Sequence, residues 1–225
     1  MKAVILVAGK GVRMGDLTKD TPKPLLKIGS KTILEYKIEA LPTTIDEVIL
    51  VIGYLGDKVR ATIGDSFAGR KITYIEAEPL GTAYALWQTA HLLKEHFIVM
   101  NGDDLYARRD IEECLKYEQS GLISKFSGGM SGGKMEIKDG LVVDILEGIY
   151  DGDGLMSTGL FVLSPVIFKY QMLKMPGREE YGIPPTIIQA VHEMPITAVY
   201  VTKWKQISAP QDIDVSPEEM AGYME

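Results

Sequence analysis

Four short, largely apolar runs in the first half of the chain predict buried strands. They cover residues 3–8, 47–53, 71–75 and 97–100. A strand with one face in water alternates apolar and polar residues, whereas runs of this kind are typical of a parallel sheet that is covered on both faces. We therefore expect these strands to form the centre of the molecule.

Two segments between these runs have helical periodicity. Apolar residues recur at spacings of three and four in 32–41 and in 81–95. Strands that alternate with helices indicate an α/β fold with a doubly wound, mostly parallel, Rossmann-like sheet.

The second half of the chain has a different pattern. Two strand-like segments, 134–138 and 141–145, flank Asp139-Gly140, and this dipeptide predicts a tight β-hairpin. Segment 121–133 is rich in Gly and Ser, and we expect it to be mobile. Further strands are predicted at 155–163 and 196–201, with a helix that starts at Ser164-Pro165. No repeat or linker is evident, so residues 1–225 are expected to form a single domain.

Composition narrows the possible partners. The chain has 24 Lys and Arg residues against 31 Asp and Glu residues, a net charge of −7. Such a protein is a poor candidate for nucleic-acid binding, which depends on neutralising phosphates. No apolar run approaches the length of a membrane span, so we expect no membrane partner and a cytoplasmic protein. Cys114 is the only cysteine, which excludes an internal disulfide; it is predicted to pack inward on a helix.

A glycine-rich loop directly follows the first strand. Gly9 and Gly11 allow the backbone to turn N–H groups towards an anion, and Lys10 and Arg13 add positive charge. The loop is no dinucleotide fingerprint, because Met14 stands where a third glycine is needed, and it lacks the Gly-Lys-Ser/Thr of a P-loop.

Lys23 lies between Pro22 and Pro24. The prolines restrict the backbone on both sides of this lysine, and a rigidly held ammonium suits a phosphate site.

With these residues the sequence resembles the sugar-phosphate nucleotidyltransferase family, whose signature is Gly-x-Gly-x-Arg followed by Pro-Lys-Pro. The resemblance implies a GT-A-type fold and an enzyme that joins a nucleoside triphosphate to a sugar 1-phosphate, or a similar phosphorylated acceptor, with release of pyrophosphate. It assigns nucleotide binding to the loop Ala8, Gly9, Lys10 and Gly11. Arg13 and Lys23 are then catalytic residues that neutralise charge on the triphosphate.

The resemblance also assigns base recognition to Glu76, Gly81 and Thr82. A carboxylate only accepts hydrogen bonds, and guanine and cytosine offer more donors than uracil or thymine. Glu76 therefore favours GTP or CTP over UTP and dTTP.

The family has a catalytic aspartate that binds Mg²⁺, and Asp103 stands at its place in this sequence. A second carboxylate usually completes the metal site, but Gln206 stands at that position. Either metal binding is weaker, or Asp212 or Asp104 compensates, or catalysis has been lost.

The acceptor side follows the family less closely. The resemblance places Gly133, Glu147 and Ser157 there, while Gly148 replaces the usual lysine. We thus divide the domain into a nucleotide-binding half, 1–120, and an acceptor-binding half, 121–225, with a homo-oligomer possible. Two alternatives stay open: a catalytically impaired nucleotide- or sugar-binding regulatory homologue, and a glycosyltransferase of related fold. The latter would usually have an Asp-x-Asp metal motif, a spacing that Asp103-Asp104 lacks.

Overall fold

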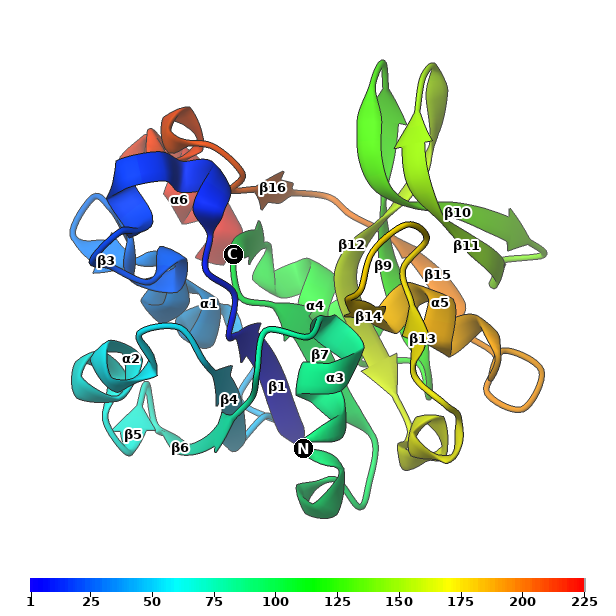
Figure 1. The fold of residues 1–225 in the computed structure, drawn as a ribbon, viewed down its shortest axis with the longest axis horizontal. Helices are drawn as coiled ribbons and strands as arrows, with labels where there is room; N and C mark the ends of the chain where they lie inside the picture. Colours follow the sequence, from blue (N-terminus) through cyan, green and yellow to red (C-terminus); the bar gives the residue numbers. More distant parts are fainter. Residues whose placement is uncertain (225) are drawn as a thin grey trace.

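The computed structural model describes residues 1–224 and has a large mixed sheet with helices on both faces (Figure 1). The large sheet contains β1 (Lys2–Val7), β4 (Glu47–Ile52), β5 (Ser66–Phe67), β6 (Arg70–Glu76), β7 (Phe97–Asn101), β9 (Ser120–Ser127), β10 (Met130–Lys138), β11 (Leu141–Tyr150), β12 (Asp153–Leu163) and β15 (Thr197–Tyr200). Three short pairs are β2 (Lys27–Ile28) with β3 (Lys31–Thr32), β8 (Asp104–Tyr106) with β16 (Trp204–Gln206), and β13 (Leu173–Lys174) with β14 (Tyr181–Gly182).

The helices are α1 (Ile33–Ala40), α2 (Gly56–Ile63), α3 (Thr82–Trp87), α4 (Arg108–Cys114), α5 (Ile183–Ile188) and α6 (Pro217–Met224). Short 3₁₀ helices are η1 (Val12–Thr18), η2 (Lys23–Leu25), η3 (Ala90–Leu92), η4 (Pro165–Lys169) and η5 (Pro210–Ile213). Over residues 1–224, no helix has the length and apolar character that crossing a membrane requires.

The predicted parallel strands form one block, in the order β6-β4-β1-β7. Strand β12 then pairs antiparallel with β7 and with β9, which continues the sheet into the second half of the chain. The α/β fold is confirmed, and its parallel part is concentrated in the first half, because the later strands are joined mainly by short antiparallel connections.

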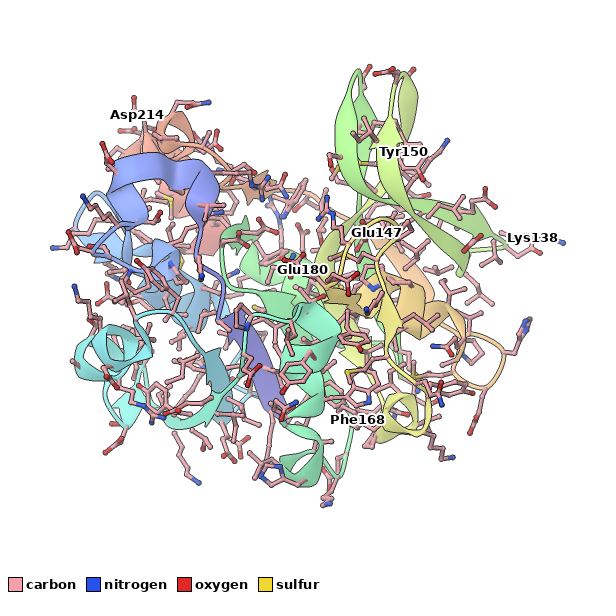
Figure 2. All side chains as sticks on the ribbon, in the orientation of Figure 1. Lys138, Glu147, Tyr150, Phe168, Glu180 and Asp214 are labelled. Atoms are coloured by element: carbon pink, nitrogen blue, oxygen red, sulfur yellow. The ribbon has the colours of Figure 1, made fainter. Side chains whose placement is uncertain are left out.

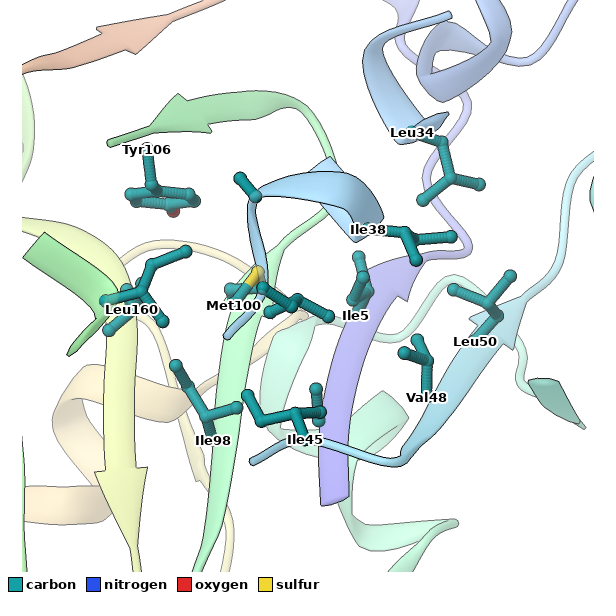
Figure 3. Close-up of a cluster of buried hydrophobic side chains, with 14 of the residues drawn as sticks. Ile5, Leu34, Ile38, Ile45, Val48, Leu50, Ile98, Met100, Tyr106 and Leu160 are labelled. Atoms are coloured by element: carbon teal, nitrogen blue, oxygen red, sulfur yellow. The ribbon is translucent and has the colours of Figure 1, made fainter. Parts of the chain in front are cut away.

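Alternate side chains of the central strands enter two separate cores, as expected for strands buried on both faces. Ile5, Leu50 and Ile98 pack with α1, α2 and α4 in one core (Figure 3). Val4 and Val99 pack with α3 and α5 in the other. Cys114 is fully buried in the first core, as predicted.

Of the two helices predicted from the sequence, one is confirmed and the other is shorter than predicted. Helix 32–41 is confirmed as α1, which begins with a capping box in which Thr32 and Glu35 bond each other's backbone N–H. The helix predicted over 81–95 is too long: α3 ends at Trp87. The Thr89 hydroxyl donates to the carbonyl of Leu86 at 2.6 Å, and the chain continues as the 3₁₀ turn η3.

The hairpin around Asp139-Gly140 is confirmed, with positive φ at both residues (51° and 78°). Our expectation that 121–133 is mobile was wrong, because this segment lies mostly within β9 and β10. Leu122 and Ile123 are fully buried there. The Gly- and Ser-rich composition of the segment did not reveal that β9 packs an apolar face on the core.

Strands β9, β12, β10, β11 and β15 pair with one another in a ring. The ends of β9 to β12 stand above the rest of the sheet, and we call β10 with β11 the hairpin lobe (Figure 1). The lobe thus flanks the carboxyl-terminal end of β7.

Candidate active site

A cleft of about 660 Å³ opens at the carboxyl-terminal ends of β1 and β7. This edge is where α/β folds place ligands. Its charged lining comprises four cations and three carboxylates, namely Lys10, Arg13, Lys23, Arg178, Glu78, Asp103 and Glu180. The cations of the cleft lining therefore outnumber its carboxylates by one.

The glycine-rich loop forms one wall of this cleft. Gly11 adopts left-handed backbone geometry, with φ 64°, and its carbonyl accepts the Thr18 hydroxyl at 3.0 Å. A Cβ at Gly11 would lie 2.9 Å from Cβ of Lys23, so the loop packs directly on the lysine stem. Gly9 and Lys10 are exposed, which leaves their backbone and charge open to a ligand. Ala8 and Arg13 also line the cleft.

Lys23 and Asp103 form an ion pair within the cleft. The Lys23 Nζ lies 2.6 Å from Asp103 Oδ2, although the two residues come from distant segments. Pro22 precedes a 3₁₀ turn that fixes Lys23, in which Leu25 N–H donates to the Pro22 carbonyl at 2.8 Å. Gly102 packs against β1 so closely that a Cβ would lie 2.5 Å from the Leu6 carbonyl oxygen. These contacts fix both partners of the pair.

A buried polar network lies behind Asp103. Burial, and then the charge of Asp103, raises the pKa of Asp104 to about 7. Burial lowers the pKa of Lys37 to about 8, and its ammonium donates to the Asp104 backbone carbonyl while lying 4.3 Å from the centre of the Tyr106 ring. The Tyr106 hydroxyl donates to the carbonyl of Thr158 on β12 at 2.7 Å. The network thereby connects the Asp103 loop with α1 and with the acceptor-binding half.

Gln206 does lie at the cleft, on β16 directly across from Asp104 on β8. Neither aspartate that we considered as a substitute carboxylate is placed for that role. Asp212 caps η5 by accepting the N–H groups of Ser208 and Ala209, each at 2.7 Å, and Asp104 is buried. Within residues 1–224, no three His, Cys, Asp or Glu side chains are grouped to hold a metal.

Glu76 lies beside the cleft and not in its lining, and its role in base recognition stays a prediction. It belongs to an adjoining hollow of about 760 Å³, which also contains Tyr54 and Tyr84 and shares Glu78 with the cleft. Its carboxylate pairs with Arg60 at 3.1 Å, because α2 lies beside the end of β6. Glu78, two residues later, lines both spaces and was missed by sequence reasoning.

Gly81 and Thr82 line the cleft and also contact the backbone of Tyr181 and Ile183. With φ 107°, Gly81 lies so close to the Tyr181 backbone that a Cβ would be 2.3 Å from the Tyr181 carbonyl oxygen. The Thr82 hydroxyl accepts the N–H of Ile183 at 3.1 Å. The glycine that we assigned to close approach of a base is thus required for close approach of another protein segment.

The three acceptor-side residues come together where β12 meets the hairpin lobe. Gly133 and Glu147 are paired across β10 and β11, and a Cβ at Gly133 would lie 3.1 Å from Glu147 Oε1 and 3.7 Å from Ser157 Cβ. Figure 2 shows Glu147 along the lobe, between Tyr150 and the turn at Lys138.

Arg178 is a cleft residue that sequence reasoning missed. It lies between β13 and β14, where its N–H donates to the Met175 carbonyl at 3.0 Å. Burial raises the pKa of Glu147, and the charge of Arg178 opposes that rise, so the guanidinium is near the acceptor-side residues. The position of this loop depends on tertiary contacts that no local pattern reveals.

Comparisons of the sequence with family models and with known proteins agree on one family. Residues 2–123 match the family model described as nucleotidyl transferase. The chain is 33% identical over 178 residues to the D-glycero-alpha-D-manno-heptose 1-phosphate guanylyltransferase of Campylobacter jejuni, covering 75% of this chain and 78% of that protein. It is 29% identical over 224 residues to the bifunctional protein GlmU of Methanococcus vannielii, where it covers 95% of this chain but 53%, about half, of the relative's length.

The fold also matches solved structures. The inositol-1-phosphate CTP transferase from T. maritima superposes with a TM-score of 0.77 at 22% identity, covering 100% of this chain and 96% of that one. This likeness supports the α/β fold described above.

Proposed function

The chain belongs to the nucleotidyl transferase family, and from that membership we propose that it transfers the nucleotidyl group of a nucleoside triphosphate to the phosphate of a sugar 1-phosphate or similar acceptor. Pyrophosphate is the second product. The observation that carries this proposal is the cleft in which Lys23 meets Asp103 beside the glycine-rich loop.

The proposed reaction is an in-line displacement at the α-phosphorus. An acceptor phosphate oxygen attacks, the bond to the leaving pyrophosphate breaks, and no covalent intermediate with the enzyme forms. Arg13 and Lys23 would neutralise negative charge on the triphosphate and on the leaving group. Most of the rate gain would come from holding both substrates in one cleft.

The donor atoms at the cleft fit Mg²⁺. Asp103 offers a carboxylate about a third exposed, and Gln206 offers an amide oxygen at the same cleft. Proteins commonly bind Mg²⁺ through one or two carboxylates together with substrate phosphates. When bound, the ion would neutralise phosphate charge and polarise the α-phosphorus.

The residues also favour particular substrates. Glu76 and Glu78 supply carboxylate acceptors in and beside the cleft, which suits the donors of guanine or cytosine. Arg178, near Glu147, would bind the acceptor phosphate in place of the lysine that Gly148 replaces. Glu147 and Ser157 would then contact acceptor hydroxyl groups.

The test is pyrophosphate release with each of GTP, CTP, UTP and dTTP, combined with a panel of sugar 1-phosphates, with Mg²⁺ and with a chelator. We expect turnover that requires both substrates and the metal. Lys23→Ala should lower kcat by about a hundredfold or more, the loss expected when a charge-neutralising group is removed. Lys169→Ala, which removes an exposed lysine paired with Glu193, is the matched control and should leave kcat unchanged.

Gln206 supports a second candidate, a homologue that binds nucleotide without turnover. In that case calorimetry would detect nucleotide binding, while no combination of substrates would release pyrophosphate. Absence of both binding and turnover would reject both candidates.

A further inference from the structure

The ion pair between Lys23 and Asp103 is unusual because one partner is almost fully buried. The Lys23 side chain is 6% exposed and that of Asp103 is 35% exposed. A buried ammonium requires a close anion, and Asp103 Oδ2, at 2.6 Å, is the anion that it has. The carboxylate proposed to hold a divalent cation is therefore already bound to a cation.

The stem of Lys23 is fixed, but its ammonium lies beside the phosphate-binding loop. The position of a Cβ on Gly11 would be 2.9 Å from Cβ and 3.4 Å from Cδ of Lys23. A triphosphate in that loop would thus lie within reach of the same ammonium after rotation of the side chain alone. Exchange of one anion for another at Lys23 would then need no movement of the backbone.

The rest of the cleft gives a free divalent cation little reason to bind. Gln206 contributes an oxygen but no charge. The cationic side chains of the lining exceed its carboxylates by one, and the part of the chain that the structure describes has no group of three acidic or imidazole ligands. A cation at either oxygen of Asp103 would also face the positive charge of Lys23 across a short distance.

We propose that Lys23 is the counter-ion of Asp103 in the free protein, and that a divalent cation binds there only when a triphosphate draws Lys23 away. This inference rests on the proposed function for the identity of the triphosphate. The exchange balances charge: the ammonium passes from carboxylate to phosphate, and the carboxylate becomes available to the incoming cation. Metal and nucleotide then bind with positive coupling.

The experiment measures binding of Mn²⁺, a spectroscopic substitute for Mg²⁺, by electron paramagnetic resonance without any turnover. We expect the purified full chain to bind Mn²⁺ weakly in the absence of nucleotide. After addition of a non-hydrolysable GTP or CTP analogue, Mn²⁺ should bind at least about tenfold more tightly than it binds to the analogue alone or to the protein alone.

Three variants separate this idea from simple weakness of the site. Lys23→Met keeps the aliphatic stem that packs on Gly11 but removes the charge, so nucleotide-free Mn²⁺ affinity should rise by about tenfold or more. Lys10→Met makes the same change at the exposed lysine of the cleft and should alter that affinity by less than about threefold. Gln206→Asp adds a carboxylate at the exposed end of β16 and should also create nucleotide-free binding.

The proposal is overturned if wild-type protein binds free Mn²⁺ as tightly as Lys23→Met does. It is also overturned if neither Lys23→Met nor Gln206→Asp binds free Mn²⁺ better than wild type. Circular dichroism of each variant verifies folding, and Gln206→Asp decides the matter if Lys23→Met does not fold. These titrations need no catalysis. A protein that shows the Lys23→Met effect but never binds a triphosphate would retain the counter-ion role and lose the proposed function.

Discussion

At the scale of single residues, the cleft depends on side chains whose roles follow from charge and reach. Arg178 is the clearest case, since it is the only cation that the β13–β14 connection brings to the lining. A guanidinium binds phosphate through two parallel hydrogen bonds, and this geometry suits a phosphomonoester acceptor. Arg178 lines the same cleft as the glycine-rich loop, and its charge opposes the rise that burial causes in the pKa of Glu147.

Replacing Arg178 by Ala is expected to raise the KM for the acceptor by about tenfold to a hundredfold, the cost of losing charge-assisted hydrogen bonds. Nucleotide affinity, measured by calorimetry without acceptor, should change little because Lys10 and Arg13 of the cleft remain to bind the triphosphate. Arg109→Ala is the matched control, since that exposed arginine donates to Thr202 on another face. An unchanged acceptor KM with weaker nucleotide binding would instead place Arg178 at the triphosphate.

A second residue-scale question is which carboxylate reads the base. Glu76→Gln keeps an acceptor for Arg60 and adds an amide donor, so it should shift the ratio of kcat/KM for GTP against UTP by about tenfold towards UTP. Glu78→Gln is the comparison, as it makes the same change where the hollow meets the cleft. A shift with Glu78→Gln alone would transfer base recognition to that residue. No shift in either would remove the carboxylate argument for GTP or CTP.

At the scale of elements, the sequence predicted the buried strands well because β1, β4 and β7 are buried on both faces and need continuous apolar residues. It failed at β9, where glycine and serine dominate the composition while Leu122 and Ile123 make the core contacts. The sequence showed in which order the cleft motifs follow one another along the chain, but not how they lie relative to one another in the folded protein. Glu76, for example, pairs with Arg60 of α2, a helix that no local pattern predicted.

Tyr106 illustrates how separate elements are joined beneath the site. Tyr106→Phe removes the hydroxyl that donates to the Thr158 carbonyl at 2.7 Å and lies 3.3 Å from Asp104 Oδ2. We expect the free energy of unfolding to fall by about 1–3 kcal/mol in urea titrations. The acceptor KM should also rise, because Thr158 adjoins Ser157. Tyr223→Phe, at a buried tyrosine in the cluster around α6, should cost less and leave KM unchanged. Equal effects from both variants would mean that Tyr106 contributes only packing.

At the scale of the whole molecule, the buried network links folding stability to pH. Burial, reinforced by the charge of Asp103, raises the pKa of Asp104 from its ordinary 3.8 to about 7. Between these two values the unfolded chain has lost this proton while the folded protein retains it. The free energy of unfolding therefore falls as pH rises through this window, by at most about 1.4 kcal/mol per pH unit from this group, and levels off above pH 7.

The neutral form of Asp104 also agrees with its surroundings, since its Oδ1 is buried without a hydrogen-bond partner among residues 1–224. Asp104→Asn keeps the shape of the side chain and removes its titration. Urea unfolding of wild type and variant at intervals from pH 4.5 to 7, in the presence of a chelator, should show a steeper decline in the wild type, with the two curves diverging in favour of the variant as pH rises. Parallel curves would mean that Asp104 stays ionised in the fold and that Lys37, whose pKa burial lowers to about 8, compensates its charge. In the expected case, a cleft lined with cations for anionic substrates has no buried negative charge directly behind Asp103.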